Sequence, residues 1–435
     1  MKFEEIQLTS ELRGHCLNST QCISPDGRYV VYDTRNDDAA LAANGQIRVL
    51  DIQTGEDRLV YETKNQTEFG PGVGAATWSP DGKMILFLGG IQNAARHRPY
   101  AFTRRTGIAV ELCNSGVPLW MDARDMNLPT TPGALRGGTH AHTWSGRDNW
   151  ISFTYNDHII AEAAKTDPSL ADLRTVGIMM PGAVEVCGAD GVENKSGLMY
   201  SVLVVPVRKD PTPGSDEVSK AFDECWIGEN GYINATGSRQ RKAIAFQGNV
   251  ADDNGSVKTE IFVADLPDDL PDWVKQNAGG GTRTSMPAVP GVIKRRRISF
   301  TKCGVSALPR HWLRTVPDGS LIGFYAGDDK GIVQLWGISP NGGVIKQLSR
   351  LPASASGPFN FSFDGKYAAC IAGDRVWVIN LADGSTEALV SKESTPGCLD
   401  GAVVWSPCSY TLFYNCYVGC PPGRYRQIFS VCMNT

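Results

Sequence analysis

A four-residue turn motif that recurs along the chain restricts its fold more than any other feature. The motif reads SPDG at residues 24–27 and 79–82, and related forms begin at residues 145, 316, 362 and 406. Proline and the Asp-Gly pair supply the backbone angles of a tight connection between two strands, so each copy predicts a hairpin. Apolar segments of strand length follow each copy, such as RYVVYD and QIRVLD after the first one.

Four strands in each repeat, with a new repeat roughly every 40–60 residues, predict a β-propeller. We count seven blades: six carry the turn motif, and the seventh is predicted between residues 196 and 300. The segments GLMYSVLVV, KAIAFQGN, TEIFVADL and RRRISF supply its strands. The 435 residues are therefore expected to form a single all-β domain, a seven-bladed propeller, rather than the roughly three domains that length alone suggests.

The two ends of the chain are expected to meet in the last blade. This blade ends with RQIFSV and lacks an outer strand of its own, whereas the N-terminal segment EEIQLTS resembles an outer strand such as IKQLSR. The N-terminal strand is therefore predicted to join the last blade and close the ring. Closure removes the open sheet edges that would otherwise pair with other chains.

Two long segments interrupt the repeat, at about residues 114–139 and 208–240. In the second one, Ser215 followed by acidic residues predicts the beginning of a short helix. Long ordered loops in compact folds often carry function, so both insertions are candidates for a role in the site.

Charge and hydropathy exclude some classes of partner. The chain holds 42 basic and 46 acidic residues, a net charge of −4, without a long block of either sign. A protein that coats nucleic acid should show a basic surface, so no nucleic-acid partner is expected. No apolar run approaches the roughly 20 residues of a membrane-spanning helix, so no membrane partner is expected either.

The N-terminus and the cysteines predict a cytoplasmic protein. Acidic residues stand near the N-terminus, where an export signal needs an apolar segment. The twelve cysteines show no CxxC spacing and are best interpreted as free, buried or half-buried thiols in a reducing compartment.

Two of the six histidines occupy the same position in different blades. His140 and His311 each stand five residues before a turn motif, at the head of a predicted innermost strand. The heads of these strands converge on one mouth of a propeller's central channel. Other blades have small residues at this position, which would leave room there: Ser19, Gly74, Gly357 and Gly401.

Two further histidines are expected at the same mouth. His142 is two residues beyond His140, and side chains two apart on an extended chain point to the same side. His158 ends the strand that returns to this mouth. Neutral imidazole suits Mn, Fe, Ni or Zn, so His140, His142 and His311 are predicted to bind a divalent transition metal. The alternative is that these histidines hydrogen-bond the ends of strands.

Charged residues are expected around these histidines. Arginine can hold a carboxylate or phosphate with two parallel hydrogen bonds, which would suit an acidic sugar or a similar anion. The candidates for binding substrate are Asp33, Arg35, Asp328 and Asp329, and those for catalysis are His158, Arg310 and Arg136. Asp122, Asp125 and Asp157 are candidates for orienting a ligating imidazole. The alternative for each charged residue is an ion pair that ties blade ends together.

Several long motifs resemble a known bacterial family. The SPDG blades are similar to TolB-type, WD40-like propellers, and the segments TPGALRGGTHAHTWS, PGSDEVSKAF, RRRISFT and PRHWLR resemble the YidR-like proteins. The likeness runs through nearly the whole chain and implies the fold but no established activity. More distantly, the His-x-His at residues 140 and 142 resembles oligogalacturonate lyases, seven-bladed propellers whose histidines hold manganese. That resemblance makes Mn the favoured metal.

Two functions from different classes are compatible with these observations. The first is a metal-dependent carbohydrate-active enzyme, most concretely a lyase that carries out β-elimination on a uronic acid or another oxidised sugar in the central pocket. Its partner would be a small acidic sugar or oligosaccharide. The second is a non-catalytic propeller that binds a ligand or serves as a platform for other proteins, because fold alone does not decide function.

Overall fold

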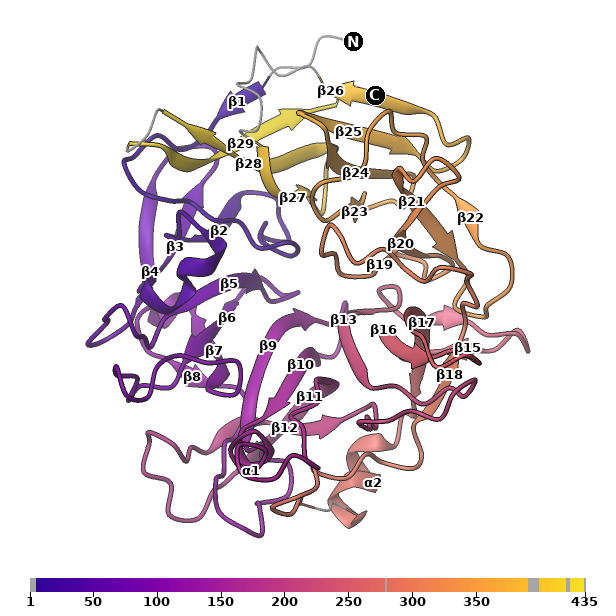
Figure 1. Cartoon of the computed structure of the whole chain (residues 1–435). Helices are drawn as coiled ribbons and strands as arrows, with labels where there is room; N and C mark the ends of the chain where they lie inside the picture. The colour runs from indigo at the N-terminus through magenta and orange to yellow at the C-terminus, as the bar shows by residue number, and fades with distance from the viewer. Residues whose placement is uncertain (1–4, 278–279, 390–398, 420–422, 434–435) are drawn as a thin grey trace.

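A computed structural model of the chain describes residues 5–277, 280–389, 399–419 and 423–433. Seven small antiparallel sheets stand around a common centre, as Figure 1 shows. The prediction of an all-β, seven-bladed propeller is confirmed. Among the described residues, no helix is both long and apolar enough to cross a membrane.

The first three blades follow one another from the N-terminal side of the chain. Blade 1 contains β2 (Tyr29–Asp33), β3 (Gln46–Asp51) and β4 (Asp57–Glu62), and isolated bridges from Cys16 and Ile23 to β2 mark its inner edge. Blade 2 contains β5 (Val73–Trp78), β6 (Met84–Gly90), β7 (Arg105–Glu111) and β8 (Leu119–Trp120). Blade 3 contains β9 (Gly137–Trp144), β10 (Ile151–Asp157), β11 (Thr175–Val184) and β12 (Gly197–Leu203).

The other four blades complete the ring. Blade 4 contains β13 (Lys220–Trp226), β16 (Lys242–Ala251), β17 (Val257–Leu266) and β18 (Lys294–Arg297). Blade 5 contains β19 (Arg314–Thr315), β20 (Ile322–Gly327), β21 (Val333–Ile338) and β22 (Lys346–Gln347). Blade 6 contains β23 (Asn360–Phe361), β24 (Tyr367–Ala372), β25 (Arg375–Asn380) and β26 (Thr386–Leu389). Blade 7 contains β27 (Leu399–Trp405), β28 (Thr411–Val418), β29 (Tyr425–Cys432) and β1 (Glu5–Gln7).

Few elements lie outside the blades. Two α-helices, two 3-10 helices and a small hairpin connect strands: α1 (His158–Ala163), α2 (Leu270–Asn277), η1 (Asp38–Ala43), η2 (Leu112–Asn114), and β14 (Tyr232–Ile233) with β15 (Arg239–Gln240).

The N-terminal strand closes the ring as predicted. β1 is the outer strand of blade 7 and pairs antiparallel with β29, with Glu5 opposite Val431 and Gln7 opposite Phe429. In Figure 1 the indigo β1 lies beside the yellow β29, which shows that the two ends of the chain share one sheet.

Side-chain hydrogen bonds explain why the turn motif recurs. The Ser24 hydroxyl donates to Asp26 at 2.5 Å and accepts from the Tyr29 amide at 2.8 Å. The same pair forms between Ser79 and Asp81 at 2.6 Å. The glycine that ends the first motif has a φ of 73°, a region that favours glycine. The motif is therefore a self-contained turn that holds two strands of one blade.

The predicted strand assignment of the fourth blade is wrong in one respect. Residues 197–203 form β12, the outer strand of blade 3, and the innermost strand of blade 4 is β13 at residues 220–226. β13 lies inside the segment predicted as an insertion because its KAFDECW sequence carries three charged residues and lacks the turn motif.

Two expectations about the insertions also change. Residues 208–219 form turns, and Ser215 donates a hydrogen bond to the Thr212 carbonyl oxygen at 2.7 Å instead of beginning a helix. The segment 114–139 contains β8 and the beginning of β9, so only its middle part is a loop.

Gln21 joins blade 1 to two other blades near the centre of the ring. Its carbonyl oxygen accepts from the Trp78 amide in blade 2 at 2.8 Å. Its side chain donates to the Trp144 carbonyl oxygen at 2.9 Å and accepts from the Trp144 amide at 3.0 Å in blade 3. The indole rings of Trp78 and Trp144 are buried, as is that of Trp405, so their predicted role in packing is confirmed.

Replacing Gln21 with Ala should destabilise the propeller. The change leaves the buried amide and carbonyl groups of Trp144 without partners, which should lower the free energy of unfolding by about 1–3 kcal/mol. Urea unfolding followed by tryptophan fluorescence measures this loss. The matched control is Gln46→Ala, because the Gln46 side chain bonds the exposed Glu62 side chain and, at 3.4 Å, the Arg48 guanidinium, but no buried backbone group. Equal losses in the two variants would contradict the central role of Gln21.

Candidate functional site

A cavity of about 590 Å³ lies at the centre of the ring. Side chains and backbone from blades 1 to 3 and 5 to 7 line it. Part of its wall is the segment Ser19–Thr20, and Ser19 accepts hydrogen bonds from Arg314 of blade 5 and from Asn360 of blade 6. Through these bonds the segment links blade 1 to blades 5 and 6 beside the pocket.

His140 presents two unpartnered ring nitrogens in the wall of this pocket. The residue is 4% exposed, and neither Nδ1 nor Nε2 has a hydrogen-bond partner among the residues that the structure describes. Burial, reinforced by Arg105, Arg174 and Arg310, holds the pKa of His140 well below its ordinary value. The imidazole is therefore neutral and can accept a proton or a hydrogen bond from a ligand.

His142 lines the same pocket, and a hydrogen bond to Thr139 holds its ring in place. Its Nε2 lies 3.0 Å from the Thr139 hydroxyl oxygen, and Thr139 donates to an Asp122 carboxylate oxygen at 3.0 Å. Burial and then Arg105 lower the pKa of His142 to about 3. The strand between the two histidines is not regularly extended, because Ala141 has a φ of 59° and forms a bulge in β9.

Positive charge dominates the pocket wall. The arginines that line it are Arg35, Arg105, Arg310, Arg314 and Arg426, whereas the carboxylates that line it are Asp38 and Asp400. Among the described residues, Arg105 forms no ion pair, and its guanidinium lies over the rings of Tyr100 at 4.7 Å and Phe102 at 4.5 Å. Burial, followed by the repulsion from nearby arginines, lowers the pKa of Arg105 to about 10 against the favourable influence of Tyr100.

Arg310 and Arg314 complete the positive side of the pocket. Arg310 donates to both oxygens of Asp223, at 2.6 and 3.2 Å, and lies 4.6 Å over the Trp312 ring. Arg314 donates to the Asn360 side-chain oxygen at 2.8 Å. Its charge has no carboxylate partner in the described part of the chain, and burial lowers its pKa to about 10.

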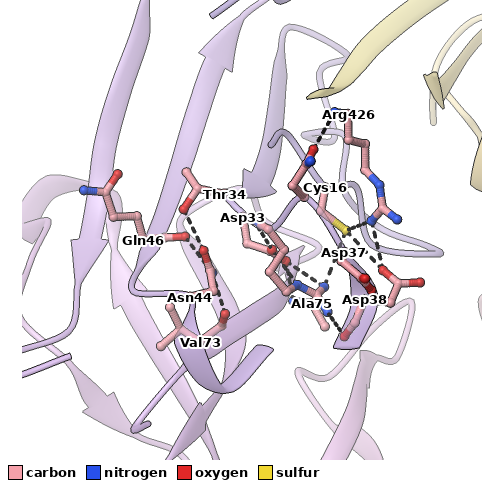
Figure 2. Close-up of polar contacts among 12 residues, drawn as sticks. Cys16, Asp33, Thr34, Asp37, Asp38, Asn44, Gln46, Val73, Ala75 and Arg426 are labelled. Carbon is pink, nitrogen blue, oxygen red and sulfur yellow. Dashed lines mark hydrogen bonds and ion pairs between the residues drawn. The ribbon is translucent and has the colours of Figure 1, made fainter. Parts of the chain in front are cut away.

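The opposite side of the pocket is a network of paired charges, which Figure 2 shows. Arg426 donates to Asp38 at 2.9 Å and to the Cys16 sulfur at 2.8 Å, and it also hydrogen-bonds Asp400. These contacts connect blade 7 to blade 1. Burial raises the pKa of Cys16 to about 12, so its thiol stays protonated.

Asp33 and Arg35 form the part of this network next to blade 2. Arg35 donates to both Asp33 oxygens, at 2.6 and 2.9 Å, and Asp33 accepts from the Ala75 amide at 3.0 Å. Arg35 lines the pocket, whereas Asp33 is fully buried behind it. The pair therefore acts as the blade-end ion pair that was the alternative to substrate binding.

The three-histidine metal set is not assembled. His311 hydrogen-bonds the Pro309 carbonyl oxygen through Nδ1 at 3.0 Å, and its Nε2 accepts from the Tyr325 amide at 3.1 Å. Both ring nitrogens are used inside blade 5, so His311 has no lone pair to give a metal. In the described part of the chain, no group of three or more His, Cys, Asp or Glu side chains is arranged to hold a metal ion. The residues present therefore do not fit the predicted metal site.

Two predicted catalytic residues lie away from the pocket. Arg136 is fully buried and donates to Asp157 at 2.8 Å, to the Thr282 carbonyl oxygen at 2.6 Å and to the Ser285 carbonyl oxygen at 2.5 Å. These bonds anchor a connecting segment to blade 3. His158 begins α1, and its Nδ1 lies 2.9 Å from the Thr103 hydroxyl oxygen, outside the pocket wall.

Asp328 and Asp329 also lie outside the pocket. Asp328 accepts hydrogen bonds from the amides of Lys330 and Ile332, both at 2.9 Å, and so shapes the turn between β20 and β21. Asp329 is exposed in the same turn. The structure brings neither carboxylate to the central pocket, because the end of this hairpin lies farther out on the blade.

Several pocket residues carried no recognised signal in the sequence. Arg105 and Arg426 stand on the second or third strands of their blades and lack a turn motif beside them. Trp312 stands one residue after the predicted His311. A comparison of the blades shows an arginine near the beginning of the strand in both cases, and this shared position is the pattern that indicates the two pocket residues.

Sequence comparison identifies the family of this chain. The "Uncharacterized protein YidR" of Escherichia coli (strain K12) is 35% identical over 408 residues, which is 92% of this chain and 92% of that protein. The chain belongs to the YidR family. Residues 72–190 of this YidR family member also match a protein family that is described as "Protein of unknown function (DUF3748)". That range contains Arg105, His140 and His142.

Solved structures support the fold of this YidR family member. An oligogalacturonate lyase from Vibrio parahaemolyticus has a TM-score of 0.53 at 10% identity, covering 100% of this chain and 98% of that one. An oligogalacturonate lyase in complex with manganese has a TM-score of 0.51 at 11% identity, again covering 100% and 98%. A puromycin hydrolase has a TM-score of 0.51 at 12% identity, covering 94% of this chain and 51% of that one. At such identities the likeness concerns the fold alone.

The buried state of His142 predicts a dependence of stability on pH. The unfolded chain protonates this histidine below about pH 6.5, whereas the folded protein does not until the pH is much lower. Stability should therefore fall as the pH decreases. The difference in the free energy of unfolding between the wild type and His142→Gln should change by about 2 kcal/mol between about pH 7 and pH 5.

Urea unfolding at both pH values measures this change. Other groups lose stability in acid as well, but they do so equally in both proteins, so only the difference reports on His142. Parallel losses in the two proteins would show that His142 is protonated in the folded state.

Proposed function

We propose that the central pocket binds a small acidic sugar or acidic oligosaccharide and that the protein acts on it as a lyase. The observation that carries this proposal is Arg105, a half-buried cation, beside the neutral His140; among the described residues, Arg105 has no carboxylate partner and the His140 nitrogens have no hydrogen-bond partner. A carboxylate on the ligand would neutralise the arginine, and the histidine would accept a proton from the ligand. The fold likeness to an oligogalacturonate lyase supports the choice of an acidic oligosaccharide.

The shape and lining of the pocket support a sugar. Its volume of about 590 Å³ is in the usual range for small-molecule sites. Phe102 and Trp312 lie in its wall beside Arg105 and Arg310. Aromatic faces pack against the C–H groups of a sugar ring, whereas the guanidinium groups bind its carboxylate.

β-Elimination needs groups that this pocket contains. A base removes the proton from the carbon next to the carboxylate, and the electron pair forms a carbon–carbon double bond. The bond between the next carbon and its oxygen breaks, and the leaving oxygen takes up a proton. His140 or His142 would accept the first proton, and Arg105 and Arg310 would stabilise the charge that develops on the carboxylate.

Of the residues proposed from the sequence, Arg310, His140 and His142 keep a place in this site, whereas Arg35 lines the pocket as the ion-pair partner of Asp33. A divalent metal, with Mn favoured, would have two imidazoles available, those of His140 and His142, and would need oxygen ligands from the substrate or water. The metal dependence is therefore a point to test and not a step in the proposed reaction.

Binding without catalysis is the second candidate. The use of both His311 nitrogens inside blade 5 favours it, because it leaves the pocket without the three-imidazole site of a metal-dependent lyase. For the compartment we propose the cytoplasm, because the ten described cysteines are free thiols, as is typical of proteins in a reducing compartment.

Arg105→Met should weaken the binding of digalacturonate at least tenfold, because the variant removes the cation that would pair with the ligand carboxylate. Isothermal titration calorimetry measures the affinity. The matched control is Arg241→Met, which removes an exposed arginine in blade 4 and should leave the affinity unchanged. Equal affinities for the wild type and Arg105→Met would rule out the proposed binding site.

Turnover separates the two candidate functions. A lyase should convert digalacturonate to an unsaturated product, whose conjugated double bond absorbs ultraviolet light. Activity that appears only with added Mn²⁺, and is lost in His140→Ala, would establish a metal-dependent enzyme. Tight binding with no product, with or without Mn²⁺, would establish the binding protein instead.

A further inference from the structure

Asp122 is fully surrounded by hydrogen-bond donors at the base of the pocket wall. Its Oδ1 accepts from the Thr106 hydroxyl and from the Gly107 amide, both at 2.7 Å. Its Oδ2 accepts from the Thr139 hydroxyl at 3.0 Å. Burial raises the pKa of Asp122, and the three hydrogen bonds to its carboxylate oxygens limit that rise. The sequence suggested Asp122 only as one of several carboxylates that orient a metal ligand.

The Thr139 hydroxyl connects Asp122 to His142 through two hydrogen bonds. A hydroxyl has a single hydrogen, and that of Thr139 is given to Asp122. Toward His142 Nε2, which lies 3.0 Å away, the Thr139 oxygen can only accept. The hydrogen of the neutral imidazole must therefore be on Nε2, and Nδ1 is left with a lone pair.

The packing around the ring supports a single orientation. A Cβ atom at position 107 would lie 3.1 Å from His142 Nε2 and 3.4 Å from Asp122 Oδ1, so the glycine admits the close approach of the two groups. A flipped ring would lose the contact with Thr139. His140 has no comparable support, since both its nitrogens lack partners.

We propose that Asp122 and Thr139 are positioning residues that hold His142 as the Nε2–H tautomer, so that Nδ1 accepts a hydrogen bond from a hydroxyl group of the ligand. The tautomer stands on the hydrogen bonds alone, whereas the ligand rests on the proposed function. The arrangement narrows the ligand class. Together with the unpaired Arg105, it selects an acid that also carries a hydroxyl donor, as an acidic sugar does and a fully ionised inorganic anion does not.

Nitrogen NMR of the ligand-free protein tests the tautomer. The protein is labelled with ¹⁵N-histidine, and the His142 signals are assigned as those that disappear in His142→Gln. In the wild type we expect a protonated Nε2 and an unprotonated Nδ1. Thr139→Val removes the hydroxyl, so it should release the ring and yield a mixture of tautomers. A wild-type signal from protonated Nδ1 would overturn the proposal.

Two matched variants keep the test decisive. Thr106→Val also removes one hydroxyl that bonds Asp122, but it leaves the link to His142, so the tautomer should stay fixed. Thr139→Ser keeps the hydroxyl and should behave as the wild type, which separates the hydrogen bond from any effect of folding. Equal tautomer mixtures in Thr139→Val and Thr106→Val would contradict a specific role for Thr139.

Calorimetry with digalacturonate tests the ligand contact. Thr139→Val should lose about tenfold in affinity, the equivalent of one hydrogen bond, whereas Thr106→Val should remain within about twofold of the wild type. If the wild type does not bind digalacturonate but the tautomer is fixed as described, the proposed function fails and the positioning role stands. If the wild type binds and Thr139→Val binds equally well, the hydroxyl contact to Nδ1 is wrong.

Discussion

One short segment of blade 1 holds the ring together across its centre. Ser19 bonds to blades 5 and 6, and Gln21 bonds to blades 2 and 3, in each case through groups that are buried or lie at the pocket. A propeller with an open channel would be held mainly by contacts between neighbouring blades. Here one short connecting segment, residues 19–21, bonds blades that are not neighbours of blade 1, and Ser19 and Thr20 form part of the pocket wall.

The arginines on the two sides of the pocket differ in whether they have carboxylate partners. On the side of blades 1 and 7, every arginine of the wall has a carboxylate partner, as Arg35 and Arg426 show. On the other side, the buried Arg314 and the half-buried Arg105 have no such partner among the described residues, although removing an unpaired cation from water is unfavourable. The first side is explained by its role in joining blades. Arg314 also supports the fold through its bonds to Ser19 and Asn360, whereas Arg105 makes no such link between blades in the part of the chain that the structure describes, which is why we relate Arg105 to an anionic ligand.

Sequence reasoning reached the fold because the turn motif is local. Ser24 and Asp26 form their hydrogen bond two residues apart, so the pattern can be read from the letters alone. The site depended on contacts distant in sequence. His311 has the same position as His140 in its blade, yet Pro309 and Tyr325 occupy its nitrogens, and no repeat pattern encodes those partners. Arg105 was missed because it is distinguished by the lack of a carboxylate partner among the described residues, and the sequence does not show which carboxylates lie near a side chain.

Closure by the first strand has a consequence for how the protein is made. Glu5 pairs with Val431, so the first strand, β1, has no partner until β29 has left the ribosome. Arg426 of β29 also reaches the pocket wall and bonds Asp38 there. Contacts of such sequence separation form late and slowly. A nascent or truncated chain without β29 therefore has neither a closed ring nor a complete pocket, and formation of the ligand site has to wait for this strand.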